Sequence, residues 1–440
     1  GPDLEDVASQ GGLTPRQVIR EHSEAEYTVY MLGFRPGFPY LGILPESLRI
    51  RRLPAPRLRV PQGSVGFADA MVGIYPLDSP GGWRLIGRTP LPIYEPLAAD
   101  PILLRPGDRV RFTPVSSARF PERAATWPMP VPARPALEVL SPGLYSTIQD
   151  GGRRGYRSLG VPPSGAMDLA ALWAANIAAG NLPGAPALEV TAPGPVLRAL
   201  DHLTVALAGA DLSAAVDGTE VEPAGPLRLR PGQRLQFGVP RTGVWAYVAV
   251  AGGIEGRMAL GSASTFVPGI LGGSAGRRLR EGDVLGQAGM PQSRADPGST
   301  PRLPLPQGSV SVRVIPGPQD EWLTEEARRA LMKEEYRTSL QSDRTGIRLD
   351  GAALAHGAAG EFLSDGVLPG AVQVPSGGRP IVIMPDGPTT GGYPKAAVVI
   401  AADLRLLAQA RPGTGVRFRP VSMEEAVEAL RLTAQMGDGG

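Results

Sequence analysis

The sequence predicts a mainly β protein with a few helices, organised as repeated β-barrel-like units. Of its 440 residues, 58 are Gly and 48 are Pro, yet 42% are hydrophobic. Enough apolar side chains therefore remain to fill a core, and the composition is typical of many short strands joined by tight turns rather than of a disordered chain. The chain is too long for one ordinary core, so we expect several domains.

Internal repetition is the second observation behind this fold class. A turn with the letters Arg-Pro-Gly followed by a strand pattern occurs at residues 104–115 and again at 410–421, with a weaker copy at 229–237. A strand, a proline and a hydroxyl–Gly–Gly–aromatic turn also recur, at residues 74–83 and 383–393. Duplicated β-barrel-like units, with loops that face one another across a cleft, explain both repeats.

Helices are expected at only a few places. The first lies within residues 3–24, where Thr14 is a natural N-cap, Pro15 the first helical residue and Gln17 the capping-box partner. A second helix is predicted over 169–179, between the cap Asp168 and the stop Gly180. The remaining helices are expected at 321–335, at 404–410 and after the capping box formed by Ser422 and Glu425.

Short strands with turn signals about every ten residues fill the rest of the chain. Two proline-rich stretches, at 127–135 and 289–307, read as linkers. The predicted division is a remnant helix of a truncated N-terminal domain (1–24), a first barrel (25–134), a second barrel unit (135–297) and a third (298–440). Strands are expected at 27–32, 65–67, 72–75, 85–89, 104–115, 137–140, 143–150, 203–205, 228–237, 245–250, 310–315, 347–349, 372–374, 381–384, 396–400 and 416–421.

Composition also excludes several function classes. The net charge is +2, with no basic patch for a nucleic acid, and no apolar run reaches the roughly 18 residues that a membrane span needs. The absence of cysteine rules out a thiolate nucleophile and a cysteine metal site, and three scattered histidines make a zinc site improbable. There is no phosphate-binding P-loop motif. A cytoplasmic protein without a metal site is the resulting expectation.

The loop 385–395 is the strongest candidate for chemistry. It contains Lys395, and the chain uses lysine only here and at Lys333 among 44 Lys and Arg residues. A compact ammonium in a chain that otherwise uses arginine indicates a site that needs lysine chemistry. Asp386 in the same loop and Gln373 one strand earlier complete the predicted catalytic set, because a carboxylate beside a lysine exchanges protons or holds a substrate amide. A surface lysine, a turn-forming aspartate and an exposed glutamine remain the alternative.

Glycine pairs in the two related loops predict the substrate-binding residues. Backbone N–H groups without side chains in the way suit a carboxylate or a developing oxyanion, although a plain tight turn explains a single Gly-Gly equally well. Tyr40 and Trp83 offer flat walls for a small planar substrate, or else belong to the core. The predicted substrate-binding residues are Thr389, Thr390, Gly391, Gly392, Tyr393, Tyr40, Ser79, Gly81, Gly82 and Trp83.

Long motifs in these regions resemble a known pair of protein families. Residues 33–42 (GFRPGFPYLG) and 79–90 (SPGGWRLIGRTP) resemble the KipI family, also called allophanate hydrolase subunit 1. Residues 148–156 (IQDGGRRGY), 164–168 (SGAMD) and 389–395 (TTGGYPK) resemble KipA, or subunit 2. The chain is thus similar to a fusion of the two, for which the resemblance implies cyclophilin-like β-barrels.

The resemblance implies subunits B and C of an ATP-dependent 5-oxoprolinase, which opens 5-oxoproline to glutamate with a separate LamB/YcsF-type subunit. ATP, with Mg²⁺, is the implied cofactor, and the lactam is expected between the loops 79–83 and 389–395. A related module implies the first alternative, a biotin-dependent carboxyltransferase acting on urea or a similar small amide. The second alternative is a protein-binding regulator of a kinase. A homo-oligomeric state is left open.

Overall fold

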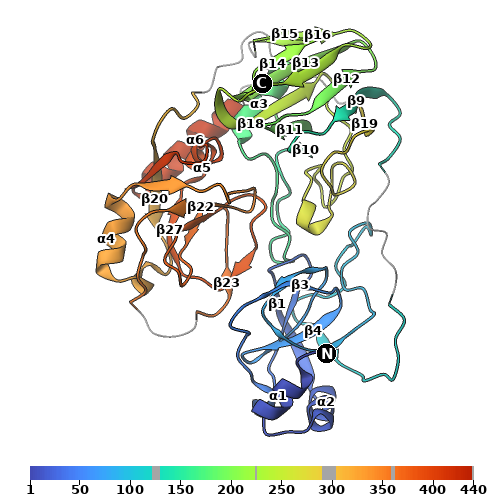
Figure 1. Cartoon of the computed structure of the whole chain (residues 1–440), viewed down its shortest axis with the longest axis vertical. Coiled ribbons are helices and arrows are strands. Elements are labelled where there is room, and N and C mark those ends of the chain that lie inside the picture. The colour runs from blue at the N-terminus through green and yellow to red at the C-terminus, as the bar shows by residue number, and fades with distance from the viewer. Residues whose placement is uncertain (121–128, 223–224, 290–303, 358–361, 439–440) are drawn as a thin grey trace. The chain divides into compact units, whose positions relative to one another are not determined.

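The computed structural model describes residues 1–120, 129–222, 225–289, 304–357 and 362–438. The chain divides into two compact units (Figure 1). Unit 1 comprises Gly1–Ala125, Gly155–Pro162 and Pro388–Thr390, and unit 2 comprises Thr126–Arg154, Pro163–Gly387 and Gly391–Gly440. Two short segments from the C-terminal two-thirds of the sequence therefore belong to the N-terminal unit. The predicted four-part domain division remains a prediction.

Unit 1 is a six-stranded sheet with two helices at its N-terminal end. Helix α2 (Pro15–Glu24) starts at the predicted capping box, in which the Thr14 hydroxyl accepts from the Gln17 N–H and the Gln17 side chain accepts from the Thr14 N–H. Helix α1 (Leu4–Gln10) was not predicted. The sheet runs in the order β7 (Arg84–Arg88), β4 (Ser64–Ala68), β5 (Met71–Ile74), β2 (Pro39–Gly42), β1 (Glu26–Leu32), β8 (Arg109–Arg111), and a separate pair joins β3 (Arg57–Val60) to β6 (Ser79–Gly81).

The N-terminal half of unit 2 consists of two sheets and one helix. Helix α3 (Leu169–Ala178) begins at the predicted cap Asp168, whose side chain accepts from the Ala171 N–H, and it packs on β13 and β18. One sheet has the order β10 (Tyr145–Gln149), β11 (Ala187–Thr191), β18 (Thr242–Val250), β13 (Leu203–Asp211), β16 (Pro226–Leu229). The other has the order β15 (Thr219–Glu220), β14 (Ala214–Val216), β17 (Arg234–Phe237), β12 (Val196–Ala199), β9 (Pro135–Ser141), β19 (Val284–Gly286).

The C-terminal half of unit 2 is a closed seven-stranded barrel. Its strand order is β20 (Val310–Pro316), β27 (Lys395–Val399), β24 (Ala371–Gln373), β25 (Ile381–Ile383), β22 (Gly346–Asp350), β21 (Tyr336–Thr338), β28 (Gly415–Pro420), and a two-stranded pair joins β23 (Asp365–Gly366) to β26 (Thr390–Gly391). The barrel shares one hydrophobic core with α3 and β18 of the other half. The helices of this half are α4 (Glu325–Lys333), α5 (Leu404–Ala408) and α6 (Met423–Asp438).

The predicted Arg-Pro-Gly repeats are real structural repeats. At residues 105–108, 230–233 and 411–414 the first residue's carbonyl accepts from the N–H three residues later, and the glycine has a φ of 96°, 87° and 86° respectively. Such values favour glycine, which explains its recurrence. A fourth turn of the same kind, at residues 280–283 with Gly282 at a φ of 83°, escaped the sequence comparison because it lacks the proline. In each turn the glycine N–H also donates to a neighbouring segment.

The predicted fold class is confirmed as mainly β with a few helices, and closure into a barrel is seen for the sheet of the C-terminal half. The helix predicted over 321–335 is shorter: residues Asp320–Trp322 form a 3₁₀ turn, and the α-helix starts after the Thr324 cap. The capping box of Ser422 and Glu425 is confirmed. Most of the linker 289–307 and the start of the linker 127–135 lie outside the described residues. Within the described ranges, no helix is long and apolar enough to cross a membrane.

Candidate functional site

The loop 385–395 is held between two barrel strands, as predicted, and is more ordered than a bare turn. It leaves β25 and enters β27, and its centre forms the short strand β26, which pairs with β23. Its first part joins unit 2 and its residues Pro388–Thr390 join unit 1. The loop therefore contributes residues to both units.

In unit 2, Lys395 is a buried cation that pairs with a carboxylate. Its side chain is 4% exposed, and its Nζ lies 2.8 Å from Oδ2 of Asp365, which is 55% exposed. The Phe362 ring covers the ammonium at 5.4 Å from its centroid. The hydrogen bond from Lys395 holds the pKa of Asp365 below its usual range. This pair has one buried and one exposed member, so the buried ammonium needs another anion in place of Asp365 whenever that carboxylate leaves it.

Gln373 lies directly across the ladder from Lys395. The two residues are partners in the β24–β27 pairing, and Gln373 is buried. Its Nε2 lies 3.5 Å from the carbonyl oxygen of Tyr393. A Cβ on Gly391 would approach that nitrogen to 2.5 Å, so glycine lets the loop backbone pack on the amide. The structure thus brings together four of the predicted site residues, Lys395, Gln373, Gly391 and Tyr393.

Asp386 does not serve as the partner of Lys395. It is buried, and its two oxygens accept from Arg344 at 2.8 and 3.1 Å. The carboxylate that contacts Lys395 is Asp365, which sequence reasoning missed. No local pattern distinguishes Asp365 from an ordinary turn aspartate, because only the β23–β26 pairing brings it to the lysine.

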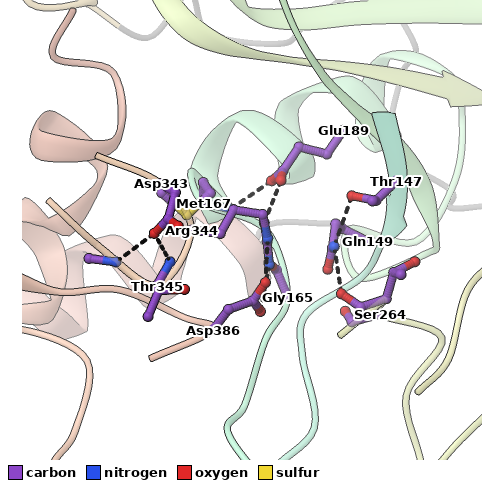
Figure 2. A network of polar contacts seen from close by, with 12 residues as sticks. Thr147, Gln149, Gly165, Met167, Glu189, Ser264, Asp343, Arg344, Thr345 and Asp386 are labelled. Atoms are coloured by element: carbon purple, nitrogen blue, oxygen red, sulfur yellow. Dashed lines mark hydrogen bonds and ion pairs between the residues drawn. The ribbon is translucent and has the colours of Figure 1, made fainter. Parts of the chain in front are cut away.

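Arg344 is the centre of a buried ionic network that anchors the start of the loop (Figure 2). It binds Asp386 on one side and Glu189 of β11 on the other, and it donates to the Gly165 carbonyl at 2.8 Å. Glu189 also accepts from the Tyr247 hydroxyl and the Met167 N–H, each at 2.7 Å. Burial opposes the charge of Arg344, but the two carboxylates outweigh it and raise the pKa of Arg344 well above its usual value.

The network ties the loop to the segment 163–168. The Ser164 N–H donates to the Pro385 carbonyl at 3.0 Å, one residue before Asp386. Arg344, Glu189 and Tyr247 were not predicted, since they come from three segments far apart in the sequence. Their side chains fix where the loop starts, and the motif SGAMD supplies backbone groups to that anchor.

In unit 1, the two repeated loops approach the same tyrosine. The Tyr40 hydroxyl lies 3.1 Å from Oγ1 of Thr390, and the Tyr40 and Trp83 rings meet at 5.8 Å between centroids. Both rings are buried in an aromatic core with Phe38. Trp83 is therefore a core residue, whereas Tyr40 links that core to the second loop. Within unit 1, Tyr40 and Thr390 are therefore in contact.

The hydroxyl residues at equivalent positions of the two loops share an unusual feature. Ser79 is 5% exposed and Thr389 is 5% exposed, and neither hydroxyl oxygen has a hydrogen-bond partner among the described residues. Buried hydroxyls are normally satisfied, so each unsatisfied one calls for a functional reason or a bound molecule. Both are consistent with the predicted binding role, which the structure leaves as a prediction.

Two of the four loop glycines, Gly81 and Gly391, serve close packing. None of Gly81, Gly82, Gly391 and Gly392 has a positive φ. A Cβ on Gly81 would overlap the Tyr75 hydroxyl at 2.2 Å, whereas one on Gly82 would meet only ordinary contacts from 3.7 Å. Gly82 and Gly392 are partly exposed, and Tyr393 is 45% exposed at the outer end of the loop.

Family models match two parts of the chain. Residues 159–420 match the carboxyltransferase domain, subdomain A and B, and residues 1–104 match the carboxyltransferase domain, subdomain C and D. The first match alone covers more than half of the sequence. It includes Arg344, Gln373, Asp386 and Lys395, and the second includes Tyr40 and the loop 79–83.

Individual relatives divide the chain in the same way. The C subunit of 5-oxoprolinase from Escherichia coli (strain K12) is 39% identical over 301 residues, which are 67% of this chain and 94% of that protein. The B subunit of 5-oxoprolinase from Escherichia coli O157:H7 is 57% identical over 114 residues, which are 26% of this chain and 52% of that protein. The chain therefore spans about half the length of that second relative.

Solved structures agree with these matches. A crystal structure of TTHA0988 has a TM-score of 0.86 at 42% identity, covering 95% of this chain and 82% of that one. The K. lactis urea amidolyase has a TM-score of 0.67 at 30% identity, covering 70% of this chain and 20% of that one. With its two halves matched in one polypeptide, the chain belongs to the carboxyltransferase-domain family that includes 5-oxoprolinase subunits B and C and urea amidolyase.

Proposed function

We propose that the chain is the fused B and C component of an ATP-dependent 5-oxoprolinase, which converts 5-oxoproline to glutamate together with a separate LamB/YcsF-type subunit. The similarity to one 5-oxoprolinase subunit over 94% of its length, and to a second 5-oxoprolinase subunit in the same chain, supports this assignment. The structural observation that carries it is the buried ammonium of Lys395, which faces an exposed carboxylate and lies beside the buried amide of Gln373.

Lys395 and Gln373 have the chemistry that a lactam requires. Hydrolysis adds water to the lactam carbonyl carbon, breaks the ring C–N bond and returns a proton to the nitrogen, giving the free amine of glutamate. Negative charge develops on the carbonyl oxygen during addition, and a desolvated ammonium stabilises such charge more strongly than one in water. We assign that role to Lys395, with Asp365 released from it, and we assign to Gln373 the orientation of the lactam amide.

Loop residues 389–393 are assigned to the carboxylate of the substrate. The Thr389 hydroxyl is buried and lacks a hydrogen-bond partner among the described residues, so it is a ready donor. The assignments of Tyr40, Ser79, Gly81, Gly82 and Trp83 to substrate binding, and of the chain to the cytoplasm, are predictions of the sequence. Asp386 takes a different part from the predicted one: it anchors the loop through Arg344 and does not touch the lysine.

The nucleotide is assigned to the partner protein. Across the described ranges, no group of three His, Asp or Glu side chains is arranged to hold a metal ion, and the sequence has no P-loop motif. When bound to the assembled enzyme, ATP supplies the free energy for lactam activation.

The test is glutamate formation from 5-oxoproline and ATP by the purified chain mixed with a LamB/YcsF-type protein. Lys395→Ala should lower kcat by about 100-fold or more, the range typical for loss of one group that stabilises a developing oxyanion. Lys333→Ala is the matched control, because it removes the chain's other lysine, which is exposed on α4. Near-ultraviolet circular dichroism checks that both variants keep the native fold.

Two results would each contradict one part of the proposal, the first the activity and the second the role of Lys395. One is the failure of the wild-type chain to form glutamate with any LamB/YcsF-type partner while it remains folded. The other is a Lys395→Ala variant that retains the wild-type rate, which would remove Lys395 from the mechanism and leave the assignment to a 5-oxoprolinase standing.

A carboxyltransferase is the second candidate, favoured by the descriptions of the two matching family models. In that reaction a carboxyl group leaves the ureido nitrogen of carboxybiotin and joins the nitrogen of urea or a similar amide. Biotin would come from a separate carrier. Transfer of labelled carboxylate from carboxybiotin to urea, in the same mixture without 5-oxoproline, distinguishes this reaction from lactam hydrolysis.

A further inference from the structure

Unit 2 contains a cavity that the proposed lactam site does not use. Its volume is about 720 Å³, within the range of small-molecule sites, and mostly apolar side chains line it. Lys395, Gln373 and Asp365 are not among the lining residues. Arg344 and Asp386 are, so the anchor of the loop forms part of the cavity wall.

Two aromatic side chains form a rigid wall of the cavity. Tyr145 of β10 and Trp245 of β18 meet edge to face, with 6.0 Å between their ring centroids. Trp245 is 7% exposed and belongs to the large core of unit 2, so its position is fixed by packing. Aromatic walls of this kind suit a flat apolar ring.

Two exposed arginines at the cavity, Arg278 and Arg411, are available to bind an anion. The guanidinium of Arg278 lies 5.4 Å from the centroid of the Tyr145 ring, and it donates to the Leu144 carbonyl at 3.4 Å. Arg411 donates to the Arg241 carbonyl at 3.1 Å. Both line the cavity, and in the described part of the chain neither forms an ion pair with a carboxylate.

The charged side chains at the back of the cavity already have hydrogen-bond partners. Arg344 is committed to Glu189 and Asp386, and the side chain of Asp343 accepts from the backbone N–H groups of Thr345 and Gly346. Three arginines and two aspartates therefore line the cavity, and Arg278 and Arg411 are the two of these arginines that no carboxylate of the described residues pairs with. Its chemical character is an aromatic wall with two available cations.

From these features we propose that the cavity is a second ligand site, which binds a small organic anion with a flat ring. The ring packs on Tyr145 and Trp245, and the anionic group accepts hydrogen bonds from Arg278 and Arg411. An aromatic carboxylate and a nucleoside monophosphate both have this chemistry. The site is independent of the proposed lactam chemistry, and its test needs neither 5-oxoproline nor a partner protein.

Binding is measured by titration calorimetry of the full chain with nicotinate and with AMP, which distinguishes a carboxylate from a phosphate ligand. Saturable 1:1 binding of at least one probe is expected. Arg278→Gln and Arg411→Gln should each weaken it about tenfold, the usual effect of losing a hydrogen bond between charged groups. Arg280→Gln, an exposed arginine outside the cavity, should bind as the wild type does.

Because the chain has no cysteine, a single introduced thiol can report the location of the ligand. Leu340, 87% exposed, lines the cavity, and Leu58, 92% exposed, lies on β3 of unit 1. A fluorophore on Leu340→Cys should respond to the bound probe, and one on Leu58→Cys should not. The proposal is overturned if neither probe binds, if Arg278→Gln/Arg411→Gln binds with wild-type affinity, or if only the Leu58→Cys label responds.

Discussion

Acidification should destabilise unit 1 through one buried histidine. His22, on the last turn of α2, is 5% exposed, and its ring packs against Phe67 and Phe112 with centroids 5.1 and 4.4 Å away. Its Nδ1 lies 2.8 Å from the hydroxyl of Tyr27, the neighbouring titratable group. Burial lowers the pKa of His22 from 6.5 to about 4. The folded state therefore keeps this ring neutral over a range in which the unfolded chain takes up a proton.

The direction and size of the effect follow from linkage. Because the folded pKa is below the unfolded one, this contribution to stability is complete above pH 6.5 and is lost as the pH falls towards 4. Proton uptake by the unfolded chain alone lowers the free energy of unfolding by about 2 kcal/mol between pH 7 and pH 5. Most aspartates and glutamates stay ionised over that interval, so the histidine effect is separable from acid denaturation.

The assay is urea unfolding at pH 7 and pH 5, followed by pulsed hydrogen exchange at one common labelling pH. Mass spectrometry of peptides from α2 and β1 then reports unit 1 alone. His22→Phe keeps an aromatic ring without a titratable proton, so its unfolding free energy should vary little between the two pH values. It should be lower by about 1 kcal/mol at both, because Tyr27 loses a hydrogen-bond partner.

His202→Phe, at an exposed position, is the matched control and should keep the wild-type pH dependence of unit 1. The reasoning is refuted if wild-type unit 1 is equally stable at pH 7 and pH 5. It is also refuted if His22→Phe loses as much stability on acidification as the wild type does.

Two stability predictions concern the loops. Arg344→Leu should destabilise unit 2 by about 3–5 kcal/mol in urea unfolding, because two buried carboxylates lose their cation. A triple variant that also replaces both carboxylates with leucine should recover most of the lost stability. An Arg344→Leu variant as stable as the wild type would contradict this reasoning. Gly81→Ala should destabilise unit 1 by about 1–3 kcal/mol, because the new Cβ would overlap the Tyr75 hydroxyl. The control Gly82→Ala should cost less than about 1 kcal/mol. Thermal unfolding measures both, and equal shifts for the two variants would argue against close packing at Gly81.

Local signals made much of the fold predictable. The capping box of Thr14 and Gln17, the cap Asp168 and the Arg-Pro-Gly turns all act within a few residues, so the sequence carries them directly. Helix α1 was missed because it depends on distant contacts: the side chain of its N-cap residue, Asp3, contacts Arg57 and the Leu85 N–H instead of capping the helix.

Site residues were predictable from the sequence only where the residue type is rare in this chain or where the residue lies close in sequence to the loop 385–395. Lys395 stood out because lysine is so rare in this chain, and Gln373 because it ends the strand before β25. Its true partner, Asp365, and the anchor Arg344 depend on tertiary pairing between distant segments. A sequence pattern records which residues are near in the chain, and hydrogen-bonding partners across a barrel leave no such record.

The chain segments that make up unit 1 determine when this unit can finish folding during synthesis. Its Leu32 forms a bridge to Leu159, and its Tyr40 meets Thr390, so its own structure is completed by residues encoded far downstream. In a ribosome-bound chain, this unit stays unfinished until residue 390 has left the exit tunnel. A single polypeptide delivers those late segments at the high local concentration that tethering provides.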